Sequence, residues 1–325
     1  MPNLARTRSS GPVERIQNPG MLAEVAAGLS SPQKELSPKF FYDQRGSELF
    51  EAITRLPEYY PTRTERALLA GWMPELMRQL GTRTLIELGA GNAEKSRIIL
   101  DAMRATGLAE MYVPIDVSGT FLSQTAAQLR REYPGLTVEP AVADISIELN
   151  LPRHLPRPAL FAFLGSTIGN FYPPAAIRLL ARVRAAMEPG DRFLLGVDLR
   201  KDIARIEAAY NDSQGLTAEF NRNMLLVLNH ELGADFDPDA FAHRAFYDTV
   251  THRIEMHLVS TRAQVVEIPG LEPIPLAAGE SIRTEISTKY DRDSVAALFA
   301  AAGLRIEAWP RDPLTPFGLV LGVRA

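Results

Sequence analysis

Residues 84–106, TLIELGAGNAEKSRIILDAMRAT, carry the clearest indication of the class of fold. This stretch opens with a short apolar run, turns through the tetrapeptide GAGN at 89–92, and continues with apolar residues at helical spacing. A buried strand, a glycine-rich turn and a helix in this order are typical of nucleotide-binding α/β sheets. Glycines let the backbone approach a ligand closely, and the start of a helix favours an anionic group. Glu94 stands where a third glycine would complete the dinucleotide motif, so an ordinary tight turn is the alternative.

The alternation of strand and helix continues to about residue 200. Further strand-like runs, with helical patterns between them, lie at 111–118, 136–146, 159–171 and 192–201. This order predicts a parallel, doubly wound sheet. After residue 201 the pattern loosens, and 241–268 and 281–290 alternate like antiparallel strands. We therefore expect an α/β fold with a second α+β domain that is either inserted within the sheet, before a final helix and hairpin, or appended to it.

The N-terminal part predicts helices and a short arm. Residues 1–20 are polar and basic, which is typical of a poorly ordered flexible arm, and 21–30 predict a short helix. A second helix is expected to open at Gly46 with Ser47 as its N-cap. A third is expected after Thr62, with Glu65 completing a capping box.

Composition narrows the class of protein. Among 325 residues, 35 Lys and Arg stand against 39 Asp and Glu, a formal net charge of −4, which argues against a nucleic-acid or membrane-surface partner. There is no Cys, which excludes disulfides, thiolate metal sites and a cysteine nucleophile, and the five His show no metal-binding spacing. No apolar run approaches the roughly 20 residues of a membrane span. We expect a monomeric, cytoplasmic protein without a metal.

Two carboxylates mark the expected nucleotide site. Asp116 ends the second strand, where it can accept both ribose hydroxyls, and Asp144 ends the third, where it can meet an adenine amine. The residues leave two ligands open, a dinucleotide and S-adenosylmethionine. Glu87 before the glycines and the missing third glycine favour S-adenosylmethionine. A strand-end Asp that merely caps a turn is the structural alternative.

Three further groups of residues are candidates for a substrate site. Asn170 follows the fourth strand within LGSTIGN, where a turn residue is the alternative. Aromatic residues before the sheet, among them Tyr42, Phe50 and Tyr59, pack in a core or form a lid whose ring faces contact a cation. Glu285 and Ser287 alternate in SIRTEISTKY and so share one face of a strand, which a solvated strand would also show.

With these segments identified, the chain resembles the histidine-specific N-α-methyltransferases of ergothioneine biosynthesis. The resemblance runs from about residue 37 to the C-terminus, and its most specific pieces are FFYDQRGSELFEAITRLPEYYPTRTE, IELGAGNAEKS, YVPIDVS, LGSTIGNF, NHELGADFDPDAF, IEMHL and RTEIS. It implies S-adenosylmethionine as cofactor, L-histidine as substrate and trimethylation of the α-amino group to hercynine. It also implies a Rossmann-like class I methyltransferase domain, at 62–200 and 287–325, and a substrate-binding domain, at 21–61 and 201–286.

The resemblance also implies roles for single residues. For the cofactor they are Gly89 and Gly91 in the turn, Lys95 at the methionyl carboxylate, Asp116 at the ribose, and Asp144 with Ile145 at the adenine. Ile145 departs from the family, whose usual G-D-F reads Ala143-Asp144-Ile145 here. For the substrate they are Tyr59 and Asn170 in the pocket, Asn170 and Tyr210 near the α-carboxylate, Glu285 and Ser287 at the imidazole, Tyr42 and Phe50 near the amine, and Met256 in the pocket wall. Tyr42 and Asn170 are the catalytic candidates.

Three rival functions remain at this point. The same fold could methylate another amine such as tryptophan, although a buried carboxylate at Glu285 offers little to an indole. A nicotinamide-dependent dehydrogenase is disfavoured by the missing third glycine. A ligand-sensing module without turnover is disfavoured by the presence of both cofactor and substrate motifs.

Overall fold

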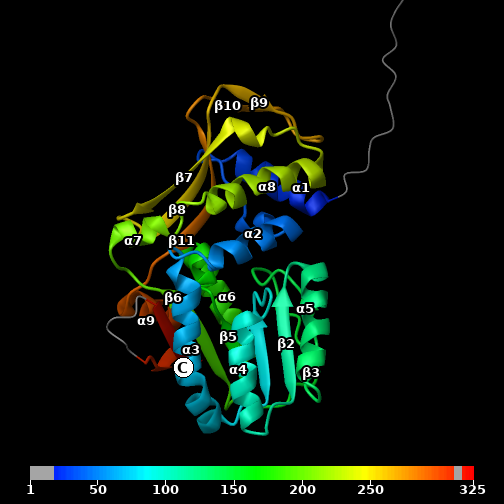
Figure 1. The fold of residues 1–325 in the computed structure, drawn as a ribbon, viewed down its shortest axis with the longest axis vertical. Coiled ribbons are helices and arrows are strands. Elements are labelled where there is room, and N and C mark those ends of the chain that lie inside the picture. Colours follow the sequence, from blue (N-terminus) through cyan, green and yellow to red (C-terminus); the bar gives the residue numbers. More distant parts are fainter. Residues whose placement is uncertain (1–17, 311–316) are drawn as a thin grey trace, which may run out of the picture.

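The strands predicted between residues 84 and 200 form one mostly parallel sheet in the lower half of the molecule (Figure 1). The structure is a computed structural model that describes residues 18–310 and 317–325. In order across the sheet, the strands are β12 (Leu304–Ala308), β13 (Phe317–Arg324), β6 (Arg192–Asp198), β5 (Ala159–Phe163), β1 (Thr84–Leu88), β2 (Met111–Asp116) and β3 (Thr137–Val138), with β4 (Ala141–Val142) also beside β2. Pairing is parallel from β6 to β3, whereas β13 and β12 run antiparallel to their neighbours. The predicted α/β fold is confirmed.

Helices cover both faces of this sheet, which explains why its central strands are apolar throughout. One face packs on α3 (Tyr60–Leu80), α4 (Glu94–Ala105) and α5 (Gly119–Glu132), and the other on α6 (Pro173–Ala186) and α9 (Arg292–Ala301). Successive strand residues point to opposite faces. Leu85 accordingly joins the core under α3 and α4, and Ile86 joins the core under α6 and α9.

The upper half of the molecule contains the predicted antiparallel strands (Figure 1). Its three-stranded sheet has the order β11 (Ser281–Thr288), β8 (Arg253–Ser260) and β7 (Phe241–Asp248), and a hairpin pairs β9 (Gln264–Val266) with β10 (Ile274–Leu276). The helices here are α1 (Pro19–Leu29), η1 (Pro38–Phe41), α2 (Gln44–Thr54), α7 (Ile203–Ala208), α8 (Leu216–Leu232) and η3 (Pro238–Ala240). One hydrophobic core joins this half, with buried residues drawn from 21–60 and 206–282.

The predicted starts of the first three helices all need correction. Asn18 caps α1, so the arm expected over 1–20 is wrong for its last residues; residues 1–17 lie outside the described part of the chain. Helix α2 begins two residues before Gly46 rather than at it. Its N-cap is Asp43, whose carboxylate accepts from Gly46 N at 2.6 Å, and Ser47 lies inside the helix. The third expected start, with its capping box at Glu65, is also wrong, because α3 begins at Tyr60.

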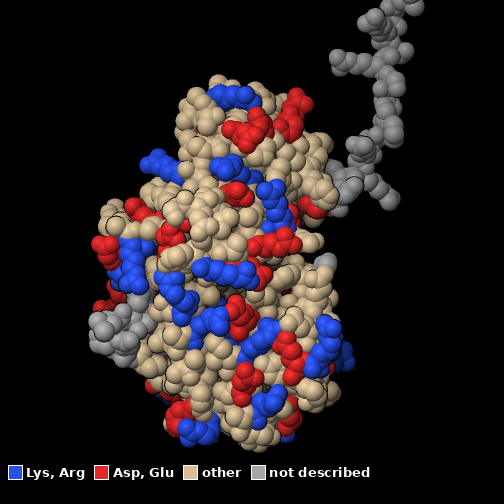
Figure 2. Space-filling model, in the orientation of Figure 1, with Lys and Arg blue, Asp and Glu red and all other residues tan. Residues whose placement is uncertain are grey.

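The surface carries charges of both signs. Figure 2 shows Lys and Arg side chains interspersed with Asp and Glu over both halves of the face in view. This mixture fits the small formal net charge of −4. Among the helices of the described residues, none has the length and apolar character that crossing a membrane requires.

Candidate active site

A cavity of about 680 Å³ lies where the carboxyl ends of β1, β2 and β5 meet the N-terminal helices α1 and α2. Its lining includes all six residues expected at a cofactor, namely Gly89, Gly91, Lys95, Asp116, Asp144 and Ile145. It also includes Tyr42, Phe50, Tyr59, Asn170 and Glu285 from the expected substrate site. The fold thus brings both groups of residues, which come from distant parts of the chain, into one continuous space.

The glycine-rich turn after β1 leaves room at the cavity wall. Gly89 and Gly91 have φ values of 67° and 53°, a left-handed conformation that side chains disfavour. A Cβ at Gly91 would meet nothing within 4 Å, so a ligand can approach this backbone closely. The Gly91 N–H donates to Asp116 Oδ2 at 3.0 Å, which joins the turn to the end of β2. Space, backbone conformation and a strand-end carboxylate together fit a nucleoside.

Asp144 is held in place by charged and polar neighbours. It accepts from Ser146 N at 2.9 Å and from Lys39 Nζ at 3.0 Å, and Lys39 also pairs with Glu24 Oε2 at 2.7 Å. Burial opposes ionisation of Asp144, but these hydrogen bonds outweigh it and lower the Asp144 pKa. Through Lys39, the N-terminal segment closes over the expected adenine end of the cavity.

Lys95 faces the cavity with a buried counter-charge behind it. Its ammonium lies 2.6 Å from Glu65 Oε2, and both carboxylate oxygens of Glu65 accept from Gly165 N at 2.9 Å. Glu65 is fully buried, whereas Lys95 is partly exposed. This pairing orients the lysine toward the ligand space and ties α3 to the loop after β5. It replaces the capping role expected for Glu65.

Glu87 stabilises the start of α4 from beneath rather than lining the cavity. Its carboxylate accepts from Tyr112 Oη at 2.5 Å and from the Ser96 hydroxyl. Burial raises the Glu87 pKa to about 7 against these hydrogen bonds, which lower it. The network joins β1, β2 and α4, so it fixes the glycine-rich turn between them.

Aromatic rings form the other end of the cavity. The rings of Tyr42 and Phe50 lie edge to face at 5.9 Å, and those of Phe50 and Tyr59 at 6.0 Å. Burial, with the negative charges of Glu285 and Asp116, raises the pKa of Tyr42 far above its usual range. Tyr42 therefore remains a neutral hydroxyl at physiological pH.

Glu285 is a carboxylate in this aromatic environment. Burial raises its pKa to about 7, opposed by the positive charge of Lys289. No group among the described residues donates a hydrogen bond to this carboxylate, although it lies in the cavity wall. A buried carboxylate costs free energy unless a donor meets it. The position is therefore suited to a ligand that carries an N–H group.

Three expected substrate residues lie behind the cavity lining. Met256 pairs with Glu285 across β8 and β11 and is 1% exposed. Tyr210 and Ser287 are also buried, and the Tyr210 hydroxyl donates to Ser287 Oγ at 2.9 Å. Tyr210 contacts the lining through its ring, which lies edge to face with Tyr59 at 6.5 Å. The expectation that Met256 lines the pocket is thus corrected to a supporting position.

The structure contains a buried charge cluster that was not predicted from the sequence. Lys289 lies 3.1 Å from Asp198 Oδ2, which also accepts from Tyr60 Oη at 2.7 Å. Lys201 pairs with the other oxygen of Asp198. Lys289 continues the alternation of Glu285 and Ser287, so period-two spacing was a usable signal for it. Nothing local in the sequence indicates Asp198 as its partner.

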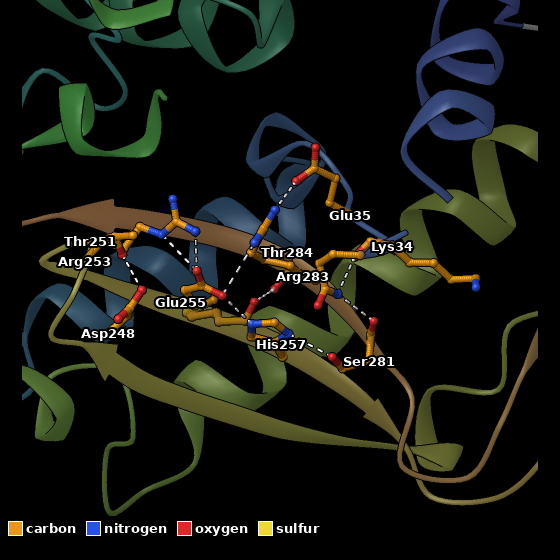
Figure 3. Close-up of polar contacts among 12 residues, drawn as sticks. Lys34, Glu35, Asp248, Thr251, Arg253, Glu255, His257, Ser281, Arg283 and Thr284 are labelled. Atoms are coloured by element: carbon orange, nitrogen blue, oxygen red, sulfur yellow. Dashed lines mark hydrogen bonds and ion pairs between the residues drawn. The ribbon is translucent and has the colours of Figure 1, made fainter. Parts of the chain in front are cut away.

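An ionic network joins the upper sheet to the cavity mouth. Figure 3 shows Glu255 between Arg253, His257 and Arg283, with Arg283 reaching on to Glu35. Arg283 lies 2.6 Å from Glu35 Oε2 and donates to Tyr172 Oη, also at 2.6 Å. Three chain segments therefore meet at one guanidinium, on the rim of the cavity.

Comparisons with known proteins agree with this site. A protein-family model described as "Histidine-specific methyltransferase, SAM-dependent" matches residues 21–324. The chain is 46% identical to histidine N-alpha-methyltransferase of Mycolicibacterium smegmatis over 93% of this chain and 94% of that one, and 45% identical to the Mycobacterium tuberculosis protein of the same name, with the same coverage. Ergothioneine biosynthesis protein 1 of Neurospora crassa is 29% identical, over 85% of this chain and 32% of that protein.

A solved structure shares the fold. The CcbJ methyltransferase of Streptomyces caelestis superposes with a TM-score of 0.50 at 14% identity, covering 87% of this chain and all of that one. The family match spans nearly the whole chain, and the cavity holds every residue expected at the cofactor. The chain belongs to the histidine-specific, S-adenosylmethionine-dependent methyltransferases.

Proposed function

We propose that this protein transfers three methyl groups from S-adenosylmethionine to the α-amino nitrogen of L-histidine, which gives hercynine, the first step of ergothioneine biosynthesis. The observation that carries the proposal is Glu285, a carboxylate at the aromatic end of the cavity to which no group among the described residues donates a hydrogen bond. An imidazole ring offers an N–H group to such a carboxylate, whereas aliphatic and phenyl side chains offer none. The relatives' names support histidine as the substrate.

The cofactor is proposed to bind at the glycine-rich end of the cavity. S-adenosylmethionine supplies an electrophilic methyl group on a sulfonium sulfur. Lys95 offers its ammonium to the methionyl carboxylate, Asp116 its carboxylate to the ribose hydroxyls, and Asp144 with Ile145 a polar edge and an apolar surface to the adenine. In-line transfer needs close approach and alignment rather than a covalent group on the protein.

The substrate is proposed to bind at the aromatic end. Glu285 and Ser287 recognise the imidazole, Tyr59 forms the wall and Asn170 binds the α-carboxylate. The amine must lose its proton to react. The neutral Tyr42 hydroxyl can then accept an N–H of the amine, directly or through water, and so orient its lone pair.

The aromatic rings also account for repeated methylation. Each transfer removes an N–H donor and leaves a bulkier cation, which a site built on hydrogen bonds would bind less well. Ring faces attract a cation without needing N–H groups. Tyr42 and Phe50 therefore suit all three stages.

We also propose that different segments of the chain bind the substrate and the cofactor. Residues 21–61 and 201–286 would bind the substrate, and 62–200 and 287–325 would bind the cofactor, with the protein acting as a monomer in the cytoplasm. The separate hydrophobic core of the upper half supports this division.

Product analysis tests the proposal. The protein is incubated with S-adenosylmethionine and all twenty amino acids in competition, and the products are followed by mass spectrometry. We expect histidine to gain three methyl groups. Preferential methylation of tryptophan or another amino acid would contradict the substrate. A time course that stops at mono- or dimethylhistidine with cofactor in excess would contradict the role given to Tyr42 and Phe50.

A further inference from the structure

Lys289 is a buried ammonium whose three protons all have partners. It lies one residue beyond β11, is 1% exposed, and continues the face of the strand that carries Glu285 and Ser287. Its Nζ lies 2.9 Å from Tyr210 Oη, 2.9 Å from Ser287 Oγ and 3.1 Å from Asp198 Oδ2. An ammonium with three donors satisfied has one orientation available. Two of its three partners are residues expected at the substrate.

These contacts fix which way the Ser287 hydroxyl can act. A serine oxygen accepts two hydrogen bonds and donates one. Ser287 Oγ accepts from Lys289 Nζ and from Tyr210 Oη, each at 2.9 Å. Both acceptor positions are filled, so its own proton remains for another partner. Ser287 lies just behind the lining, two residues after the lining residue Glu285 on the same strand face, so a ligand beside Glu285 is the partner to which this proton can be directed.

The positive charge of Lys289 also favours a neutral ring, to which Ser287 donates a hydrogen bond. A second cation placed against Ser287 would repel the ammonium, and burial strengthens that repulsion. A neutral imidazole is therefore a better partner for Ser287 than an imidazolium. The same ammonium opposes the effect of burial on Glu285 and so favours its carboxylate form. The Ser287 hydroxyl, as donor, then lies beside the Glu285 carboxylate, as acceptor.

We infer that Lys289 is a positioning residue that makes Ser287 a hydrogen-bond donor beside the acceptor Glu285, so that the site selects a neutral ring with one N–H and one bare nitrogen. The inference rests on the proposed function, since it concerns how histidine is recognised.

Lys201 provides a matched control. It pairs with Asp198, as Lys289 does, and lies 2.6 Å from Tyr60 Oη. It contacts neither Ser287 nor Tyr210 among the hydrogen bonds of the described residues. Lys201→Met therefore removes a lysine from the same aspartate while leaving the hydroxyl pair intact.

Steady-state kinetics separates positioning from support of the fold. For Lys289→Met, we expect the KM for L-histidine to rise about 10- to 100-fold with kcat changed less than about threefold, because the lost contact serves ground state and transition state alike. Lys289→Gln, whose amide still donates, should recover part of this loss, and Lys201→Met should keep KM within about threefold of wild type. S-adenosylmethionine affinity, measured by calorimetry, should be unchanged in all three.

The possible outcomes distinguish the two proposals. A wild-type protein that does not methylate histidine would refute the proposed function and this inference with it. An active wild type with an unchanged KM in Lys289→Met overturns the inference alone. Loss of cofactor affinity in both Lys289 variants also overturns it, since the lysine would then support the fold rather than the substrate side chain.

Nitrogen NMR examines the ring directly. Ring ¹⁵N-labelled L-histidine is bound together with S-adenosylhomocysteine, which permits no turnover. In wild type near pH 7, we expect the shifts of a neutral ring with one protonated and one bare nitrogen. In Lys289→Met, that single-tautomer signature should be lost. An imidazolium in the wild-type complex would overturn the inference.

Discussion

At the scale of single residues, the chemistry concentrates on one face of β11. Glu285 is a half-buried carboxylate in the cavity wall, and partial burial raises its pKa to about 7. Such a group is costly in the free protein and gains most when a ligand supplies a donor. Glu285 therefore favours substrate binding but lowers the stability of the free protein. One substitution tests its effect on substrate selection, and a second tests its effect on stability.

Removing the carboxylate should weaken histidine selection. For Glu285→Ala, we expect kcat/KM for L-histidine to fall by roughly 2–4 kcal/mol, the scale of losing a charged hydrogen-bond partner. Relative activity toward tryptophan or phenylalanine should rise, since apolar rings no longer leave a polar group unpaired. The measurement is kcat/KM for each amino acid. If the preference for histidine survives, Glu285 does not set it, and Tyr59 and Asn170 are the next candidates.

Neutralising the same side chain should stabilise the protein in a pH-dependent way. Because the folded pKa of Glu285 lies above its ordinary value, the folded state binds more protons between about pH 4.5 and 7, and stability falls as pH rises through that range. Glu285→Gln should therefore be more stable than wild type at pH 8, on the order of 1–3 kcal/mol, with the difference shrinking toward pH 4.5. Urea unfolding at both pH values measures this. An equal difference at both would show that Glu285 titrates normally.

At the scale of elements, the starts of α2 and α3 position side chains at the cavity. Asp43 caps α2 and also accepts from Asn223 Nδ2 on α8 at 2.8 Å. The cap therefore sets both the beginning of the helix and its contact with α8. Phe50 reaches the cavity from this helix. In α3, which begins at Tyr60, Glu65 lies inside the helix and pairs with Lys95.

Two substitutions compare Asp43, the observed N-cap of α2, with Ser47, the N-cap predicted from the sequence. Asp43→Ala should lower the free energy of unfolding by about 1–3 kcal/mol, since it removes a helix cap and leaves a buried amide without its partner. Ser47→Ala, inside the helix, should stay within about 0.5 kcal/mol. Chemical unfolding of the two variants side by side gives the answer. A larger loss for Ser47→Ala would restore the predicted cap.

At the scale of the whole molecule, the two halves meet around one cavity and are joined by charges. Asp198 at the end of β6 contacts Lys289 and Tyr60, and Arg283 on β11 contacts Glu35 and Tyr172. The first contact lies in the interior and the second on the rim. Closing the cavity therefore depends on contacts between segments far apart in sequence.

The rim contact should contribute measurably to stability. Arg283→Met leaves Glu35 and Glu255 without this partner, and we expect a loss of about 1–2 kcal/mol in unfolding free energy, since the guanidinium is largely buried. Arg262→Met, which breaks an exposed pair with Asp237, serves as the control and should change stability by less than about 0.5 kcal/mol. Equal losses in the two variants would mean that the rim network behaves as an ordinary surface ion pair.

Features that depend on near neighbours along the chain could be predicted from the sequence. Period-two and helical spacing predicted the parallel sheet, and strand ends predicted where Asp116 and Asp144 lie, because parallel strands bring their carboxyl ends to one edge. The same alternation placed Glu285 and Ser287 on one face. Tertiary structure alone decided the pairings of Glu65 with Lys95 and of Asp198 with Lys289, and the position of Met256 behind the lining. Such contacts join elements that are far apart in sequence. How these elements lie against one another depends on the packing of the whole core, so no local sequence pattern predicts it.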